Sequence, residues 1–143
     1  MKSSVNLLDV RAGDRVPELR RHPKTVDLFA YSAATWNKGL IHFDQDFVRS
    51  KGYDNVLVHS HLHGAYLVAA LTEWAGDPRY VRSLSMTVRK PAFAGDVLVC
   101  SGVVTEAGIV DGEFVIEVEL EEKRESADEP CALAKARLVI PSH

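Results

Sequence analysis

The stretch SHLHGAYLVAALTEW, residues Ser60–Trp74, decides the fold. Its apolar residues recur every three or four positions, which is the spacing of one face of an α-helix. Further apolar residues widen that face until the helix is apolar nearly all round, and such a helix is buried on most sides. Gly76-Asp77-Pro78 follows as a stop signal. The sequence therefore predicts one long, buried helix.

Only strand patterns follow this helix. The expected strands are Val81–Arg89, Val97–Glu106, Glu113–Arg124 and Ala132–Ile140. In the third of them, apolar residues alternate with glutamates, as in a strand with one face on a core and one in water. Asp111-Gly112 just before it is a strong hairpin signal. An antiparallel sheet of about five strands must curl around the helix to bury it, which predicts an α+β hot-dog fold as a single domain over residues 1–143.

The N-terminal part has weaker patterns. Val10–Leu19 suits a short edge strand, because it contains a proline and prolines are tolerated at sheet edges. Val26–Ser32 alternates loosely and is expected to form a second strand. Asp44 is placed to cap a short helix over residues 45–50, which Gly52 would end.

Composition and charge exclude several classes of protein. The chain of 143 residues is 46% hydrophobic and 26% charged, which argues against disorder, and its net charge of −3 gives no electrostatic case for binding nucleic acid. No apolar run approaches the ~20 residues that cross a bilayer. The N-terminus lacks the features of a secretory signal. We therefore expect a cytoplasmic protein that binds neither nucleic acid nor membrane.

Two groups of residues are expected to have structural roles only. Cys100 and Cys131 lie far apart, without metal-ligand or redox spacing, and are expected to be small buried hydrophobes. The acidic stretch Glu117–Glu129 is most simply a solvated strand face and turn.

The stretch YSAATWNKGLIHFD, residues Tyr31–Asp44, contains the candidate catalytic pair. Asn37 precedes His42 by five residues. A histidine with a pKa near ~6.5 can act as a base at neutral pH. An asparagine cannot exchange protons, so it can only position a water through its carbonyl oxygen and amide hydrogens. The alternative is that His42 only makes a hydrogen bond to a neighbouring loop.

Together the motifs resemble those of the MaoC-like (R)-specific enoyl-CoA hydratases and 3-hydroxyacyl-thioester dehydratases. The motifs that carry the resemblance are Gly13–Leu19, Tyr31–Asp44, Val56–His59 and Pro91–Leu98. Two positions depart from the family pattern. Asn37 stands where most members have aspartate, as in an asparagine-containing variant of the Asp/His motif, and Ser60 stands where a glycine usually follows the histidine.

The resemblance implies a lyase that adds water to a trans-2-enoyl thioester, or removes it from the (R)-3-hydroxyacyl thioester, as in fatty acid metabolism. His42 would be the general acid/base and Asn37 would hold the water. The backbone N–H near Ser60, at the positive end of the helix dipole, would bind the thioester oxygen. Further candidates for substrate binding are His59, His61 and Tyr31.

The same resemblance implies no cofactor, because coenzyme A or an acyl carrier protein is part of the substrate. Arg82, Arg89 and Lys90 are candidates for the coenzyme A phosphates, with solvated strand ends as the equal alternative. A single hot-dog leaves a sheet edge unpaired, and by resemblance the family pairs two such domains. We therefore expect a homodimer or a higher homo-oligomer.

His59, His61 and His63 also have the look of a zinc site, because imidazole is the commonest zinc ligand. However, helical residues two apart point to different faces, and no Cys, Asp or Glu with ligand spacing joins them. We therefore expect no metal. His59 is expected to support the catalytic loop, and His61 or His63 to face the acyl tunnel or a partner.

Two other functions stay open. A hot-dog thioesterase usually relies on a helix carboxylate, and Glu73 near the far end is the only one here. A non-catalytic acyl-CoA-binding subunit of a hetero-oligomeric hydratase would fit the departures at Ser60 and Lys38-Gly39, whereas His42 favours activity. The sequence does not define the acyl group or its carrier.

Overall fold

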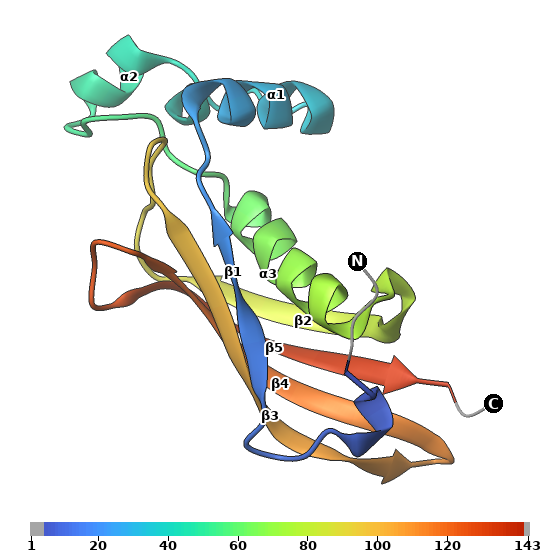
Figure 1. Cartoon of the computed structure of the whole chain (residues 1–143). Helices are drawn as coiled ribbons and strands as arrows, with labels where there is room; N and C mark the ends of the chain where they lie inside the picture. The colour runs from blue at the N-terminus through green and yellow to red at the C-terminus, as the bar shows by residue number, and fades with distance from the viewer. Residues whose placement is uncertain (1–4, 142–143) are drawn as a thin grey trace.

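The computed structural model describes residues 5–141 and centres on α3, Ser60–Ala75, which lies across one face of a five-stranded antiparallel sheet (Figure 1). The strands are β1 (Arg15–Arg21), β2 (Val81–Val88), β3 (Leu98–Val110), β4 (Glu113–Arg124) and β5 (Pro130–Ile140). Their order in the sheet is β1-β3-β4-β5-β2, so β1 and β2 form the two edges. This is the predicted hot-dog arrangement of one long helix against a curved sheet.

The helix and the hairpin confirm two local predictions. α3 begins at Ser60 as expected and ends at Ala75, one residue beyond Trp74. The next residue, Gly76, adopts φ 81° and donates its N–H to Thr72 O. In the hairpin between β3 and β4, Asp111 and Gly112 have φ of 49° and 82°. Positive φ at both central residues is what a tight hairpin turn with the correct twist requires.

Two expected strands differ from the structure. Residues Val26–Ser32 are not a strand but part of α1, Thr25–Thr35. The Asp27 carboxylate accepts the Lys24 N–H at 2.8 Å and fixes the start of this helix, which the loose alternation concealed. The expected strand Val10–Leu19 is shifted: β1 starts at Arg15, after a turn in which Gly13 has φ 95°.

Edge position explains the irregular β1. The register between β1 and β3 shifts between Val16 and Leu19, which leaves Pro17 in a bulge of an edge strand. Proline has no N–H for the ladder and is tolerated there. β3 is longer than predicted because it pairs with β4 along its whole length, up to Val110 opposite Glu113.

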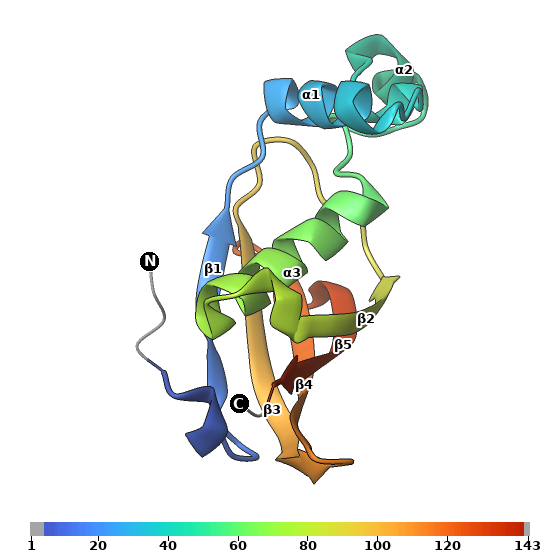
Figure 2. The same cartoon turned by 90° about the vertical axis from the view of Figure 1, so that its right-hand side faces the viewer.

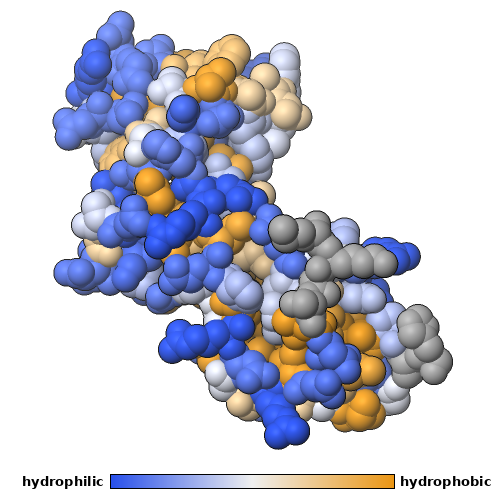
Figure 3. Space-filling view, in the orientation of Figure 1, coloured by the Kyte–Doolittle hydropathy of each residue, from blue (hydrophilic) through white to orange (hydrophobic). Residues whose placement is uncertain are grey.

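The short helices gather at one end of α3. α1 and α2 (Gln45–Ser50) lie beyond its N-terminus, as Figure 2 shows. Asp44 caps α2 as predicted, with its carboxylate accepting the Phe47 N–H at 2.9 Å. Space-filling colours in Figure 3 show apolar surface at this α1 end, where Val26, Phe29, Trp36 and Leu40 are exposed.

Two apolar clusters form the core. The larger one packs α3 residues such as Leu67, Leu71 and Trp74 against inward-facing residues of the sheet, including Ile116 and Leu138. The smaller one lies under α1 and α2 and includes Leu28, Val48 and Val58. None of the helices within residues 5–141 is long and apolar enough to span a membrane.

The larger cluster predicts a strong dependence of stability on α3. Leu67→Ala should lower the free energy of unfolding by about 2–5 kcal/mol, because Leu67 is completely buried and truncation leaves a cavity. Leu8→Ala, at an exposed leucine, should change it by less than about 0.5 kcal/mol. Urea unfolding measures both, and equal losses would contradict the central placement of α3.

Candidate active site

Asn37 is held by the end of α1. Trp36 adopts the left-handed conformation with φ 56° and closes the helix, and the Asn37 N–H then donates to Ser32 O at 2.9 Å. The Asn37 carbonyl oxygen, Oδ1, accepts the Gly39 N–H at 3.0 Å. One lone pair of Oδ1 is therefore engaged by the loop itself, while the Nδ2 amide keeps both its hydrogens for other acceptors.

The orientation of His42 follows from one hydrogen bond. Its Nδ1 atom lies 2.8 Å from Leu57 O. A carbonyl oxygen only accepts, so Nδ1 carries the hydrogen and donates it. In the neutral ring the other nitrogen, Nε2, then has a free lone pair and can accept a proton.

Gly39 lies between these two side chains. A methyl group built on its Cα would lie 3.1 Å from Asn37 Oδ1, 3.3 Å from His42 Cδ2 and 3.7 Å from His42 Nε2. The predicted pair is therefore brought together on either side of this residue. The space that a Cβ would fill adjoins the free nitrogen of His42.

His59 supports His42 from below. The two imidazole rings stack with centroids 3.8 Å apart and planes 17° apart. His59 is 1% exposed, and its Nε2 lies 2.7 Å from the Ser32 hydroxyl. Its Nδ1 has no hydrogen-bond partner in the described part of the chain. Tyr31 packs its ring against His59 with centroids 4.7 Å apart.

The pKa of His59 is lowered to about 4. Burial is the largest cause, because it removes water from the charged form, and the neighbouring His42 and His63 add to it. His59 is therefore neutral at physiological pH. A neutral ring stacked on His42 does not oppose the positive charge that His42 would gain as a base.

The other predicted residues lie at the ends of α3 and β2. Ser60 and His61 are exposed in the first turn of α3, and the helix has no side-chain cap. Arg82, Arg89 and Lys90 are exposed on β2 and the turn after it. The turn leads to Ala92, whose carbonyl oxygen accepts the Val58 N–H at 2.8 Å. Val58 lies two residues before the start of α3, so this turn is held next to the start of the helix.

Of the two histidines expected to face the acyl tunnel or a partner, His61 is exposed, whereas His63 points into the core. It is buried, and its Nδ1 contacts the carboxylate of Glu122, which is completely buried on β4. Sequence reasoning missed Glu122 and assigned its stretch to a solvated face. A signal was available, because Glu122 continues the alternation that buries Ile116, Val118 and Leu120.

Residues 9–94 match the hydroxyacyl-thioester dehydratase type 2 family, which is more than half of the chain. The chain belongs to this family. A relative among characterised proteins is the 3-oxo-4,17-pregnadiene-20-carboxyl-CoA hydratase beta subunit of Mycobacterium tuberculosis, 24% identical over 106 residues that cover 74% of this chain and 81% of the relative.

Solved structures of the family's fold agree. The ChsH1–ChsH2 complex from Mycobacterium tuberculosis matches with a TM-score of 0.78 and 22% identity over 91% of this chain and 98% of the other. The (R)-hydratase from A. caviae involved in PHA biosynthesis matches with a TM-score of 0.82 and 15% identity over 93% and 98%. Structural neighbours also include MaoC-like dehydratases. The predicted family and hot-dog fold are confirmed.

The low pKa of His59 predicts a pH dependence of stability. Unfolded His59 binds a proton as the pH falls below about 6.5, whereas folded His59 does so only near 4. Between these values the unfolded state binds more protons, so stability falls with falling pH. The melting temperature of the wild type should drop over this window, and His59→Gln should weaken that drop.

Exposed His61 supplies the control. His61→Gln should leave the slope of melting temperature against pH as in the wild type. Circular dichroism melts at stepped pH values measure all three proteins. An unchanged slope in His59→Gln would contradict the assignment of a low pKa to His59.

Proposed function

We propose that this chain is a hydro-lyase that adds water to a trans-2-enoyl thioester, or removes it from the 3-hydroxyacyl thioester. The observation that carries the proposal is the Nδ1–H of His42 donating to Leu57 O, which leaves Nε2 as a base beside Asn37. Family membership adds the reaction type. The assay below uses coenzyme A thioesters and varies the acyl group.

Each atom of the hydration has a place in this scheme. His42 Nε2 takes one proton from water as the water oxygen bonds to Cβ of the enoyl group. The electron pair of the Cα–Cβ double bond moves to give an enolate-like thioester oxygen. The resulting imidazolium of His42 then gives its proton to Cα, because Asn37 cannot exchange protons. The Asn37 Nδ2 amide donates to the water oxygen and fixes it for attack.

The developing negative oxygen needs donors. The N–H groups of Ser60 and His61 start α3, a helix of 16 residues, and belong to the first turn, where no intrahelical acceptor exists. With the helix dipole they would form the oxyanion hole. His59 would support the site by stacking on His42, and Tyr31 by packing on His59. Arg89 and Lys90, after the end of β2, would meet the carrier's phosphates. Arg82 lies at the opposite end of the same strand and does not share this role. The reaction needs no cofactor in this scheme.

Substitution of the proposed base tests the activity. His42→Ala should lower kcat/KM by about 10²–10⁴, the usual worth of a general base. Asn37→Ala should also lower it, whereas Asn37→Asp keeps an acceptor for the Gly39 N–H and should retain more activity. Loss of enoyl-thioester absorbance measures the rate with short, branched, dicarboxylic and polycyclic trans-2-enoyl-CoAs. Unchanged rates in His42→Ala would contradict the proposal.

Gly39→Ala gives a second, independent test. The φ of Gly39 is −62°, so alanine fits the backbone, but its methyl group would press against Asn37 Oδ1 and His42. Activity should therefore fall by about tenfold or more, since small misplacements of reacting groups are costly, while the melting temperature stays near that of the wild type. Gly108→Ala, where an added Cβ meets nothing within 4 Å, is the matched control.

We further propose that two chains pair. β2 is an edge strand, with β5 as its one strand neighbour in the described sheet, and open strand edges favour pairing. Light scattering after gel filtration should give about twice the chain mass of 15.8 kDa. A cytoplasmic location stays a prediction.

The relative named as a hydratase beta subunit favours a second candidate, a subunit that works only with a different partner chain. A folded protein that turns over no substrate in the panel would support this candidate. The thioesterase alternative lacks such support, because Glu73 is exposed near the end of α3 and pairs with Arg21 at 3.2 Å.

A further inference from the structure

A buried cluster of four polar side chains lies beneath the candidate active site. His63 follows His59 by one turn of α3. Glu122 comes from β4, Cys131 from β5 and Cys100 from β3, and these three strands are neighbours in the sheet. The exposed fractions of His63, Glu122 and Cys131 are 1%, 0% and 1%. A buried histidine and a buried carboxylate beside two thiols, in an apolar core, need a physical explanation.

The contacts converge on the Glu122 carboxylate. His63 Nδ1 contacts Oε1. Cys131 Sγ lies 3.5 Å from the same oxygen and 3.2 Å from the backbone carbonyl oxygen of Glu122. Cys100 Sγ lies 3.5 Å from the second oxygen, Oε2. One ligand atom from each of His63, Glu122 and Cys131 lies within 4.8 Å of the other two. Donor atoms this close can share one cation.

The charge of the buried Glu122 carboxylate needs an offset. A carboxylate taken completely out of water costs several kcal/mol unless a positive charge offsets it. Thiols are only weak donors. Arg21, which acts on Cys100, is paired with the exposed Glu73. The offset for Glu122 can come from a proton on His63, whose Nδ1 contacts the carboxylate, or from a cation held among these donor atoms.

We propose that His63, Glu122 and Cys131 bind one Zn²⁺ ion through Nδ1, Oε1 and Sγ. Nitrogen, oxygen and sulfur donors together are the ligand set of zinc, whereas magnesium and calcium take oxygen ligands. One carboxylate, one thiolate and a neutral imidazole balance the two charges of the ion, which gives a neutral site suited to the core. The site goes beyond the proposed hydration, since it shares no residue with Asn37 and His42.

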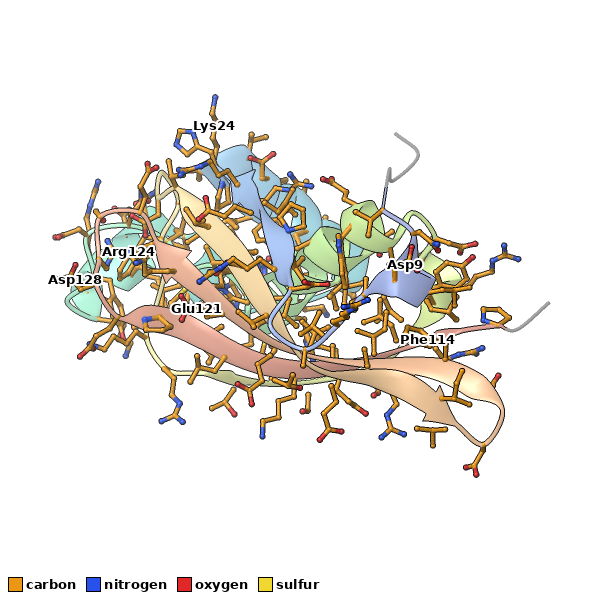
Figure 4. The ribbon with its side chains drawn as sticks, turned by 60° about the horizontal axis from the view of Figure 1, so that its bottom comes forward. Asp9, Lys24, Phe114, Glu121, Arg124 and Asp128 are labelled. Atoms are coloured by element: carbon orange, nitrogen blue, oxygen red, sulfur yellow. The ribbon has the colours of Figure 1, made fainter. Side chains whose placement is uncertain are left out.

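Binding must release the proton of Cys131, because the thiolate is the ligand. Zinc therefore competes with a proton, and its affinity should increase with pH. A surface pocket of about 390 Å³, lined by Cys131, Lys90, Arg124 and Asp128 among others, offers a route from solvent. Figure 4 labels Arg124 and Asp128 near one another at this end of the sheet.

The ion would tie three elements together. His63 is in the first half of α3, and the other two ligands are on β4 and β5. Zinc would therefore fix the end of the helix that carries His59 and the proposed oxyanion hole. The sequence predicted no metal because no Cys, Asp or Glu with ligand spacing lies near the three histidines. Glu122 is 59 positions after His63, so spacing along the chain does not reveal it.

The test uses the full chain without an affinity tag, refolded with either Zn²⁺ or a chelator. Elemental analysis should give about one zinc per chain, and the melting temperature should be higher with zinc. Refolding with Co²⁺ should give a thiolate-to-cobalt charge-transfer absorption band. A wild-type chain that takes up neither zinc nor the cobalt band would overturn the proposal.

The two cysteines form a matched pair of variants. Cys131→Ser should lose the cobalt band and most of the metal, whereas Cys100→Ser, outside the three ligands, should keep both. Glu122→Gln replaces the carboxylate by an amide of nearly the same shape and should also lose the metal. His61→Ala, at an exposed histidine, should keep the metal. Circular dichroism checks that each variant is folded. Full metal content and an unchanged band in a folded Cys131→Ser would refute the ligand assignment.

Discussion

The burial of α3 against the sheet is the constraint on which the rest of the structure depends. It fixes the rotation of the helix, because Leu67, Leu71 and Trp74 must face the strands. The rotation of the helix also determines which of the histidines near its start are buried. His59 and His63 are one turn apart and both point inward, whereas His61 lies on the exposed side. One packing interface thus decides which histidine stacks on His42 and which contacts Glu122.

The predictions that succeeded came from strong local patterns. The helix at Ser60, the Asp111-Gly112 turn and the alternation of β4 each depend on a few adjacent residues and a physical rule that leaves little choice. Val26–Ser32 failed because seven residues can fit a period of two and a period of 3.6 about equally well. The cap at Asp27, one residue beyond the window's first, contained the missing information.

In the candidate site, too, local motifs could be predicted from the sequence, whereas contacts between distant residues could not. Asn37 and His42 could be found from sequence, because they share one loop and a known motif, although nothing in the motif reveals which His42 nitrogen is free. That answer needs Leu57, 15 residues away, whose carbonyl accepts the Nδ1 hydrogen. Glu122 was missed for a different reason. Its charge favours an exposed position, whereas its place in the alternation of β4 puts it on the core face. In the structure it is completely buried.

The two polar systems of this protein are connected through His59. Its ring is stacked on His42, and both His42 and His63 contribute to the lowering of its pKa. Burial is the largest cause of the low pKa of His59, and the two neighbouring histidines add to it, so the ring stays neutral at physiological pH. A base that gains positive charge works best beside a neighbour that cannot compete for the proton. In the proposed reaction, the buried half of α3 would therefore contribute to the chemistry of His42 without touching substrate, because burial keeps the stacked His59 ring uncharged.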